Sequence, residues 1–338
     1  MSHEICVSLT QSSVSECPTA PLPLGCQTSH PPVIVVGALR SGTTLFNLML
    51  GHHRQVAHIG EYEEAVELMG DRGYPEAAEL RHHLRASRQF LASELEIDSR
   101  LNYRELVRDL LHQAAAARPE PVTGFTIHSR FDRCPDLWPE ARYIHVVRDP
   151  RDVARSCIGM GWVGNVYRGT DIWLEAERRW DRLKAEIRED QWMEVRYEDL
   201  VRNPETVLSG VCEFLGLEFD PEMLEFWRDS TYDPPDPTLI EQWRRRMTPR
   251  EIQDVEYRCG DMLTARGYIP SEHGPRTPSV SERVALDLDN RYKRAQMAVK
   301  RYGLGLWLAD RLTNRVAPAS VRTRIELRKN DADRKHLR

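Results

Sequence analysis

The chain has 338 residues, of which 41% are hydrophobic and 29% charged, and a formal net charge of −5 at pH 7. This length suffices to bury a core in one large α/β domain or two modest ones. No apolar run approaches the roughly 20 residues that span a membrane, and the amino terminus, with acidic Glu4, lacks the pattern of a secretory signal. We therefore expect a cytoplasmic protein.

Charge and cysteine are unevenly distributed. Residues 291–338 contain fourteen Lys and Arg against four Asp and Glu, a net charge of +10, so the first 290 residues carry −15. The seven cysteines are scattered and form no C-x-x-C pair, which indicates neither a disulfide framework nor a zinc site. Cys157 and Cys212 fall in apolar, helical contexts and are predicted to be core residues.

The first part of the chain predicts a leader, a strand, a loop and a helix. Residues 1–31 are rich in Ser, Thr, Pro and Cys without periodicity, which favours a mobile leader. A strand-like run at 33–36 is followed by Gly37 and Gly42 and by a predicted helix over 43–53. Glycines let the backbone approach an anion closely, and the N–H groups of the loop and helix start point at it. This loop is therefore predicted to bind an anion.

The loop differs from that of nucleoside triphosphatases. Its glycines match the spacing G-x-x-x-x-G-K-[ST], but Thr43 stands at the lysine position and Thr44 at the Ser/Thr position, while the cation is Arg40. Loss of the lysine that reaches the β- and γ-phosphates argues against nucleoside triphosphate hydrolysis. The alternative without function is a glycine-rich turn that binds nothing.

The segment after the first helix predicts a short strand and a further helix over 55–69. Glu61 and Glu63 fall near the start of that helix, and their spacing alone favours two carboxylates that complement a helix amino terminus. Helical periodicity then covers 76–97 and 103–117. We interpret residues 70–118 as a helical insertion over the entrance of the site.

Two further strands deliver polar residues to their carboxyl ends. A strand over 122–127 leads into His128, and a lone histidine there is more often structural than catalytic. A buried-type strand over 142–147 leads into Arg148, with Ser156 two helical turns further on. Open α/β sheets bind ligands at the carboxyl ends of their strands, so Arg148 and Ser156 predict a second anion-binding corner.

The remaining elements complete an α/β pattern. They are predicted, in chain order, as a helix over 171–190, a strand over 192–197 and helices over 204–215, 219–227, 249–267 and 283–301. Strands that alternate with helices indicate a three-layer P-loop-like fold, with a central, mostly parallel sheet flanked by helices.

Four motifs together give the chain a resemblance to the PAPS-dependent sulfotransferases, over residues 32–270. They occur in the order of that family: Gly37-Ala-Leu-Arg40-Ser-Gly42-Thr43-Thr44; Val147-Arg148-Asp-Pro-Arg151-Asp with Ser156; Arg196-Tyr197-Glu-Asp-Leu200 with Asn203-Pro204 and Phe214-Leu-Gly216; and Cys259 to Gly267-Tyr268. Residues 271–338 lie beyond the resemblance and read as a basic helical extension.

The resemblance implies a donor, 3′-phosphoadenosine 5′-phosphosulfate (PAPS), and the residues that hold it. Its 3′-phosphate would lie on Arg148 and Ser156, with Tyr197 near the adenine. Its 5′-phosphosulfate end would lie on the first loop, at Arg40, Ser41, Gly42, Thr43 and Thr44. Two separated anions on one nucleotide need two cationic corners, which agrees with the two that the residues themselves predict. No metal is expected.

The implied reaction is in-line transfer of a sulfuryl group to an acceptor hydroxyl or amine. Arg40 and the loop would stabilise charge that grows on the departing phosphate, while a base takes the acceptor's proton. Some members of the family use a glutamate at a position that resembles Glu61, and others a histidine at a position close to His128. We prefer Glu61, with Glu63 as a lesser candidate.

The acceptor and other partners are less defined. Carbohydrate, lipid, peptide tyrosine and small phenols all remain open as acceptors, with side chains available at Trp162, Tyr167, Trp243 and Arg244. The basic carboxyl-terminal region is interpreted as an additional helical layer; the competing hypothesis is an amphipathic element for peripheral membrane contact. Nucleic-acid binding is not expected, and a homo-oligomer is compatible with the sequence.

Two other functions compete with sulfuryl transfer. One is a P-loop nucleotide or nucleoside kinase, which Thr43 in place of lysine disfavours. The other is a non-catalytic nucleotide-binding module, against which the two base candidates argue.

Overall fold

The computed structural model describes residues 31–70, 73–91, 93, 95–116 and 122–316, and then 321, 324–325, 328–329 and 332. The predicted leader over 1–31 lies almost entirely outside the described residues. The strands and helices are, in chain order, β1 (Val33–Val36), α1 (Thr43–Gly51), β2 (Val56–Glu61), α2 (Ala77–Leu84), α3 (Arg88–Leu91), α4 (Tyr103–Ala116), β3 (Val122–Ile127), α5 (Cys134–Leu137), β4 (Arg142–Val147), α6 (Pro150–Gly159), α7 (Val166–Glu186), β5 (Trp192–Arg196), α8 (Tyr197–Arg202), α9 (Pro204–Leu215), α10 (Trp243–Arg246), α11 (Pro249–Cys259), α12 (Asp261–Ala265) and α13 (Val280–Val316).

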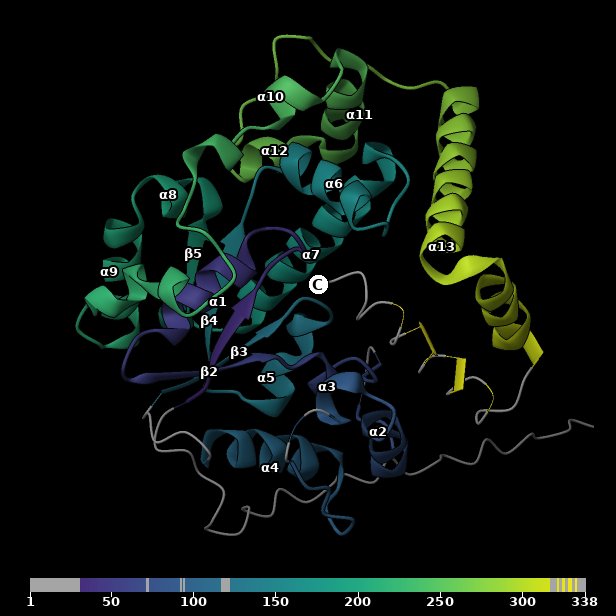
Figure 1. Ribbon diagram of the computed structural model, residues 1–338. Coiled ribbons are helices and arrows are strands. Elements are labelled where there is room, and N and C mark those ends of the chain that lie inside the picture. The colour runs from purple at the N-terminus through teal and green to yellow at the C-terminus, as the bar shows by residue number, and fades with distance from the viewer. Residues whose placement is uncertain are drawn as a thin grey trace, which may run out of the picture.

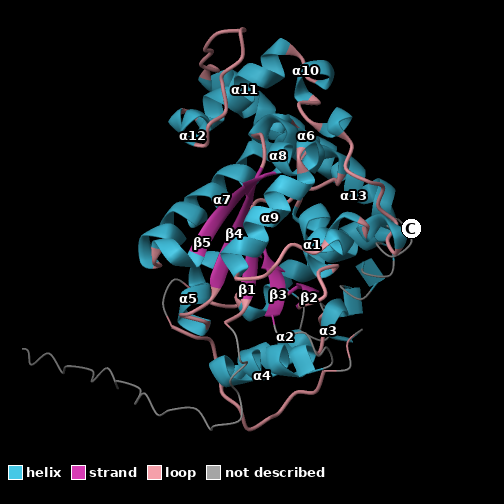
Figure 2. Ribbon diagram, turned by 90° about the vertical axis from the view of Figure 1, so that its left-hand side faces the viewer, coloured by secondary structure: helices cyan, strands magenta, loops and turns pink. Residues whose placement is uncertain are grey.

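One five-stranded sheet organises the molecule. Its order is β2-β3-β1-β4-β5, and each pair of neighbours is parallel. Figure 2 shows these strands side by side at the centre, surrounded by helices. Because all strands run the same way, their carboxyl ends meet at one edge, where β1 and β4 are direct neighbours. The segments that follow these two strands therefore lie close together.

Alternation along β1 divides the core into two layers. Ile34 and Val36 face a cluster built from α4, α6, α7 and α11, and Val33 and Val35 face a second cluster with α1 and α9. Successive side chains of a strand point to opposite faces, so an all-apolar strand must be covered on both. The predicted three-layer α/β fold is confirmed.

Proline, glycine and capping side chains mark several helix ends. Pro150 opens α6, with the Asp149 carboxylate accepting from the Arg151 N–H, and Gly216 closes α9 at φ 73°. The Asn102 and Glu105 side chains each accept from the other's backbone N–H, which forms a capping box at the start of α4. Cys157 and Cys212 are buried, as predicted.

Some predicted helices differ in extent. The region 76–97 contains two short helices, α2 and α3, and the region 249–267 is interrupted at Gly260, whose φ of 53° and ψ of −137° are incompatible with a helix. α7 begins five residues earlier than predicted, because Asn165 accepts from the Arg168 N–H and caps it there. Hydrophobic periodicity finds such helices but does not locate a break that one backbone angle produces.

The described residues of segment 70–118 pack onto the hydrophobic core. Leu80, Leu84, Leu106 and Leu110 are buried in the first core cluster. None of its described residues lines either cavity at the edge of the sheet. The predicted role of this insertion as a cover for the site stays a prediction.

Helix α13 stands along one side of the molecule, as Figure 1 shows in yellow. It is bent at Gly303, where φ is 78° and ψ is 155°. Within the described part of the chain, no helix is both long and apolar enough to cross a bilayer.

Candidate active site

A cavity of about 890 Å³ opens at the carboxyl edge of β1 and β4. Seven of the eight residues predicted to bind the donor line it: Arg40, Gly42, Thr43, Thr44, Arg148, Ser156 and Tyr197. They come from the loop after β1, the end of β4, helix α6 and the start of α8, and the parallel strand order brings these segments together.

The eighth predicted residue, Ser41, does not line the cavity. Its side chain is fully buried, and its hydroxyl oxygen has no hydrogen-bond partner among the described residues. The Ser41 N–H donates to the Ala38 carbonyl at 3.0 Å, which makes it part of the turn. Ser41 therefore shapes the loop in this structure, and the prediction of direct donor contact finds no support in the lining of the cavity.

Both glycines of the loop are required by close packing. A Cβ on Gly37 would lie 2.4 Å from the Val146 carbonyl oxygen, and one on Gly42 would lie 2.2 Å from the Tyr197 ring. Both residues also have positive φ, 152° and 94°, where a side chain is strained. The loop thus fits against β4 and Tyr197 only because these positions are glycine.

Arg40 is held in an uncommon conformation that directs it into the cavity. Its φ is 72°, which is rare for a residue with a side chain, and its Nε donates to the Ser156 hydroxyl at 3.0 Å. Helix α1 begins just behind it at Thr43, and Gly42 offers no side chain to cap the first N–H groups. A cation and open N–H groups at a helix start together form an anion site.

Arg148 forms a second cationic corner. Its guanidinium lies 4.2 Å above the centre of the Tyr197 ring and donates to the carbonyl oxygens of Arg40 and Leu239, at 3.2 and 3.0 Å. Its Nε is buried and has no hydrogen-bond partner among the described residues. An arginine fixed by an aromatic ring and two carbonyls, with a donor unused, is suited to bind an anion.

The cavity also contains polar residues that the sequence analysis missed: Asp152, Arg155, Tyr232, Gln242 and Arg246. Asp152 and Arg155 stand inside the motif between Arg148 and Ser156, so the helical spacing of that motif could have placed them on the same face. Tyr232 and Gln242 come from the loop before α10 and Arg246 from α10 itself, a segment whose path no local pattern predicts.

Asp152 has an altered acidity within the cavity wall. Burial raises the pKa of its carboxyl to about 6, against the opposing effect of Arg148, whose Nη2 lies 3.9 Å from the carboxylate. The Trp243 N–H donates to the other carboxylate oxygen at 2.8 Å. This carboxyl therefore changes charge close to neutral pH, beside the second cationic corner.

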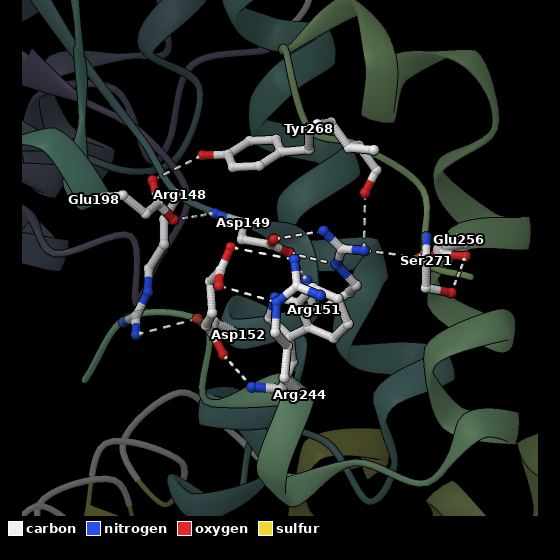
Figure 3. Close-up of polar contacts among 12 residues, drawn as sticks. Arg148, Asp149, Arg151, Asp152, Glu198, Arg244, Glu256, Tyr268 and Ser271 are labelled. Atoms are coloured by element: carbon white, nitrogen blue, oxygen red, sulfur yellow. Dashed lines mark hydrogen bonds and ion pairs between the residues drawn. The ribbon is translucent and has the colours of Figure 1, made fainter. Parts of the chain in front are cut away.

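Glu198 and Tyr268, from the last two motifs, meet Asp149 and Arg151 of the second motif in a buried polar network, shown in Figure 3. Tyr268 donates to Glu198 at 3.2 Å, and the other oxygen of Glu198 accepts from the Asp149 N–H at 3.0 Å. Asp149 in turn binds Arg151 through two hydrogen bonds, of 2.9 and 2.7 Å. Residues more than 100 positions apart in the chain thus fix the turn that carries Arg148.

The two candidate bases face each other. His128 Nε2 lies 3.7 Å from Glu61 Oε1, and His128 Nδ1 lies 3.0 Å from the Gly37 carbonyl oxygen. Burial disfavours the charged form of His128, yet the pKa of the imidazole is raised, because Glu61, the Gly37 carbonyl and Glu63 outweigh it. The His128 side chain is 6% exposed and that of Glu61 47%, so of the two the carboxylate is open to an acceptor.

Glu63 is engaged elsewhere. Its carboxylate accepts from the backbone N–H groups of His128 and Ser129 and from the Ser129 hydroxyl. Burial raises the pKa of Glu63 in spite of these bonds. A carboxylate that caps the end of β3 in this way is a structural group, so the geometry does not support Glu63 as a base.

A second cavity, of about 440 Å³, shares the lining residue Thr44 with the first and extends to Glu61. It lies between α1 and β2 and is lined by Thr44, Asn47, Leu48, Gly51, His52, His58, Ile59, Gly60 and Glu61. A molecule in this cavity would lie next to the Glu61 carboxylate and to the loop cation on the other side of Thr44.

Several side chains predicted as available to the acceptor lie in the core. Tyr167 is 4% exposed, and Trp243 is 2% exposed beneath Arg151, whose guanidinium lies 3.7 Å from the ring centre. In the sequence, an aromatic ring next to a cation suggests a surface for a ligand. Here the Trp243 ring instead packs against the buried Arg151 guanidinium in the core. The prediction that Tyr167 and Trp243 contact the acceptor is wrong.

Fold and site together define a class of protein: an α/β protein with a cavity lined by arginines at the carboxyl edge of a parallel sheet, beside a carboxylate and an imidazole. No cluster of His, Cys, Asp or Glu that could hold a metal ion occurs among the residues for which positions are described. The profile of the Sulfotransferase family matches residues 31–221, more than half of the chain. The chain belongs to the sulfotransferase family.

Individual relatives are distant. Mouse carbohydrate sulfotransferase 5 is 27% identical over 164 residues, which are 38% of this chain and 41% of that protein. Protein-tyrosine sulfotransferase A of Caenorhabditis elegans is 23% identical over 292 residues, 80% of this chain and 75% of the relative. The chain spans about two fifths of the length of the mouse relative.

Solved structures show the same fold. The sulfotransferase domain of the Synechococcus PCC 7002 olefin synthase has a TM-score of 0.52 and 23% identity, and covers 69% of this chain and 95% of its own. The sulfotransferase domain of the curacin biosynthetic pathway has a TM-score of 0.53 and 19% identity, with coverage of 72% and 99%.

Proposed function

We propose that this protein transfers a sulfuryl group from PAPS to a hydroxyl or amine of an acceptor, by in-line displacement. The observation that carries the proposal is the single cavity in which Arg40 and Arg148, two separate cationic corners, lie with the loop and Tyr197. PAPS bears a phosphosulfate at one end of its nucleoside and a phosphate at the 3′ position. Two anions on one nucleotide match two arginines that reach one cavity from different segments of the chain.

The proposal assigns each end of the donor to one corner. The loop from Arg40 to Thr44 would hold the phosphosulfate, with N–H groups of the α1 start as further donors. Arg148 and Ser156, which both line the cavity, would hold the 3′-phosphate. When bound, PAPS supplies the sulfuryl group and a phosphate leaving group. A sulfuryl group carries less charge than a phosphoryl group, so side-chain cations can offset it.

Glu61 is assigned as the base and His128 as its partner. The Nδ1–H of His128 donates to the Gly37 carbonyl, and the raised pKa of the imidazole favours the protonated form, in which Nε2–H faces the Glu61 carboxylate. The buried imidazole orients Glu61, which can accept the acceptor's proton from the second cavity. His128 as the base, with Glu61 orienting it, is the second assignment.

The acceptor would occupy the second cavity. Its lining has an amide, two imidazoles and a carboxylate but no Lys or Arg. Two relatives are named as sulfotransferases of carbohydrate and of protein tyrosine, and both of these substrate classes carry hydroxyl groups, which agrees with a hydroxyl acceptor. The choice between these acceptors stays open.

Ligand-induced stabilisation tests the donor. We expect 3′-phosphoadenosine 5′-phosphate (PAP) at about 100 times its Kd to raise the Tm by roughly 2–6 °C, and ATP with Mg²⁺ not to do so. The reverse result would support a kinase and end the proposal. Stabilisation by PAP without any turnover across an acceptor panel would favour the non-catalytic nucleotide-binding module.

The Arg148→Gln variant tests the assignment of the 3′-phosphate. Removal of a charged hydrogen-bond donor is expected to weaken PAP binding about 10- to 100-fold, and to leave the weaker binding of adenosine 5′-phosphate unchanged, because that nucleotide lacks the 3′-phosphate. Isothermal titration of both nucleotides measures the two affinities. An equal loss for both would place Arg148 elsewhere on the ligand.

The pKa of Asp152 predicts a pH dependence of donor binding. Above pH 6 this carboxyl ionises and offsets the charge of Arg148, so an incoming phosphate is bound less tightly; below pH 6 it is neutral. At pH 8 we expect the Asp152→Asn variant to bind PAP about fivefold more tightly than the wild type, which corresponds to ~1 kcal/mol of binding free energy. At pH 5 the variant and the wild type should bind PAP with equal affinity. Asparagine keeps the acceptor for the Trp243 N–H. A constant ratio between pH 5 and 8 would contradict the prediction.

A further inference from the structure

Helix α13 exposes a ladder of large apolar side chains to solvent. Val280, Val284, Leu288 and Tyr292 follow one another at intervals of four residues and are 68%, 53%, 59% and 63% exposed. Residues four apart on a helix lie on one face, so the four form a single stripe. We name these four residues the outer ladder. At its end lies a hollow of about 570 Å³, lined by Tyr292, Ala295, Gln296, Val299 and Lys300.

The opposite face of α13 is polar and is fixed to the domain. Asp287 binds Arg168, whose Nη2 lies 2.6 Å away, and the Asn290 side chain accepts from the Gly164 N–H at 2.7 Å. Asn165 donates to the Asp289 carboxylate at 3.0 Å. Polar bonds, together with the apolar contact of Met297 at Gly161, thus hold α13 on the domain, while the four residues of the outer ladder point to water.

Basic residues flank the outer ladder without acidic partners. Arg291, Arg294 and Lys300 are exposed, and none of them forms an ion pair with a described carboxylate. The acidic residues of this stretch are used elsewhere: Asp287 pairs with Arg168, and Asp289 pairs with Lys293 at 3.0 Å. The outward surface of α13 is therefore apolar in its middle and positive beside it.

We propose that the outer ladder of α13 docks this protein onto an anionic lipid surface. A helix that lies in a membrane interface buries an apolar stripe among the acyl chains and places Lys and Arg at the headgroups, which is the arrangement found here. At ~1.5 Å per residue, the straight part of α13 before Gly303 spans roughly 34 Å along such a surface.

Charge argues against a second copy of the chain as the occupant. Two α13 helices packed through their outer ladders would bring Arg291, Arg294 and Lys300 of each copy against those of the other, while Asp287 and Asp289 are already paired with Arg168 and Lys293. Like charges at close range are unfavourable. An anionic surface complements the same residues.

Docking would place the site near the membrane. Arg301 donates to the Met160 carbonyl at 3.0 Å, and a Cβ on Gly161 would lie 3.2 Å from the end of the Met297 side chain. Met160 lines the donor cavity. The docking helix is therefore joined directly to the wall of the cavity, so an acceptor at the membrane surface would lie within the reach of the site.

Vesicle flotation of the full chain tests the proposal. The wild type is expected to float with vesicles of phosphatidylserine and phosphatidylcholine, and to remain unbound with phosphatidylcholine alone. Leu288→Asp should abolish flotation, while Leu91→Asp, the same change at another exposed leucine, should not. Replacement of Arg291, Arg294 and Lys300 by Gln should lower the partition coefficient roughly 100-fold, about a factor of five for each basic residue.

Controls separate docking from misfolding and from self-association. Replacement of the exposed Arg100, Arg188 and Arg228 by Gln changes net charge equally and should leave flotation intact. All variants should keep the PAP-induced rise in Tm. Wild type that does not float, or Leu288→Asp that floats as the wild type does, would overturn the proposal. So would a wild-type dimer in sedimentation velocity that Leu288→Asp dissolves, since the occupant would then be a second copy.

Discussion

Replacement of Glu61 by Gln is expected to lower the rate of sulfuryl transfer by about 10²- to 10⁴-fold, the usual contribution of a positioned general base. Glutamine keeps the size of the side chain and can still face His128, but it cannot accept a proton. The affinity for PAP should stay within about twofold, because Glu61 lies in the second cavity and not among the residues that line the first. Single-turnover kinetics with saturating donor measure the loss in the chemical step.

Histidine titration distinguishes the two assignments of the base. The Glu61 carboxylate is among the groups that raise the pKa of His128, so Glu61→Gln should lower this pKa, as followed by NMR. In the variant, a rate that recovers as His128 loses its proton would assign the base to His128. A variant with wild-type rates and the wild-type pKa of His128 would contradict both assignments. The matched control is Glu67→Gln, a half-exposed carboxylate that pairs with His83 away from the cavities.

Replacement of Arg151 by Met is expected to lower the free energy of unfolding by about 3–5 kcal/mol, the cost of leaving buried charges without their partner. Arg151 is 2% exposed and its guanidinium binds Asp149 at 2.7 Å and Glu256 at 2.8 Å. Asp149 is itself 3% exposed, so methionine would leave this carboxylate buried without its cation. The network is drawn in Figure 3.

Urea unfolding followed by circular dichroism measures this loss. Arg188→Met is the matched control, because Arg188 also contacts two carboxylates, Asp190 and Glu140, but is 59% exposed; its midpoint should hardly move. A change at Arg151 no larger than that at Arg188 would show that the buried network contributes little. Donor affinity of Arg151→Met in the folded state should also fall, since Arg151 and Asp149 fix the turn that carries Arg148.

The local pattern of the chain determined most of the fold. The continuous apolar run of β1 needs burial on both faces, which only a sheet covered by helices on each side provides. Proline at the start of α6 and glycine after α9 mark helix ends through their own backbone angles. These signals depend only on residues close together in the chain, so the strands and helix ends can be predicted without the tertiary structure.

The same holds for the donor loop but not for the whole site. Gly37 and Gly42 indicate a close approach of the backbone in the loop. The spacing of Arg148 and Ser156 follows from one helix, so both cationic corners were predicted. That Arg40 Nε would donate to Ser156, 116 residues away, depends on β1 and β4 being neighbours in the sheet. Strand order is a property of the complete chain.

What only the tertiary structure decided is which side chains meet. Glu61 and His128 were alternatives in the sequence and are partners across β2 and β3 in the fold. Trp243 reads as a surface for a ligand, but it lies beneath Arg151 in the core. The outer ladder of α13 has the same periodicity whichever face packs inward, and only the bonds of Asp287 and Asn290 to the domain turn it to solvent. Sequence period defines the faces of an element, whereas contacts between distant segments decide where each face points.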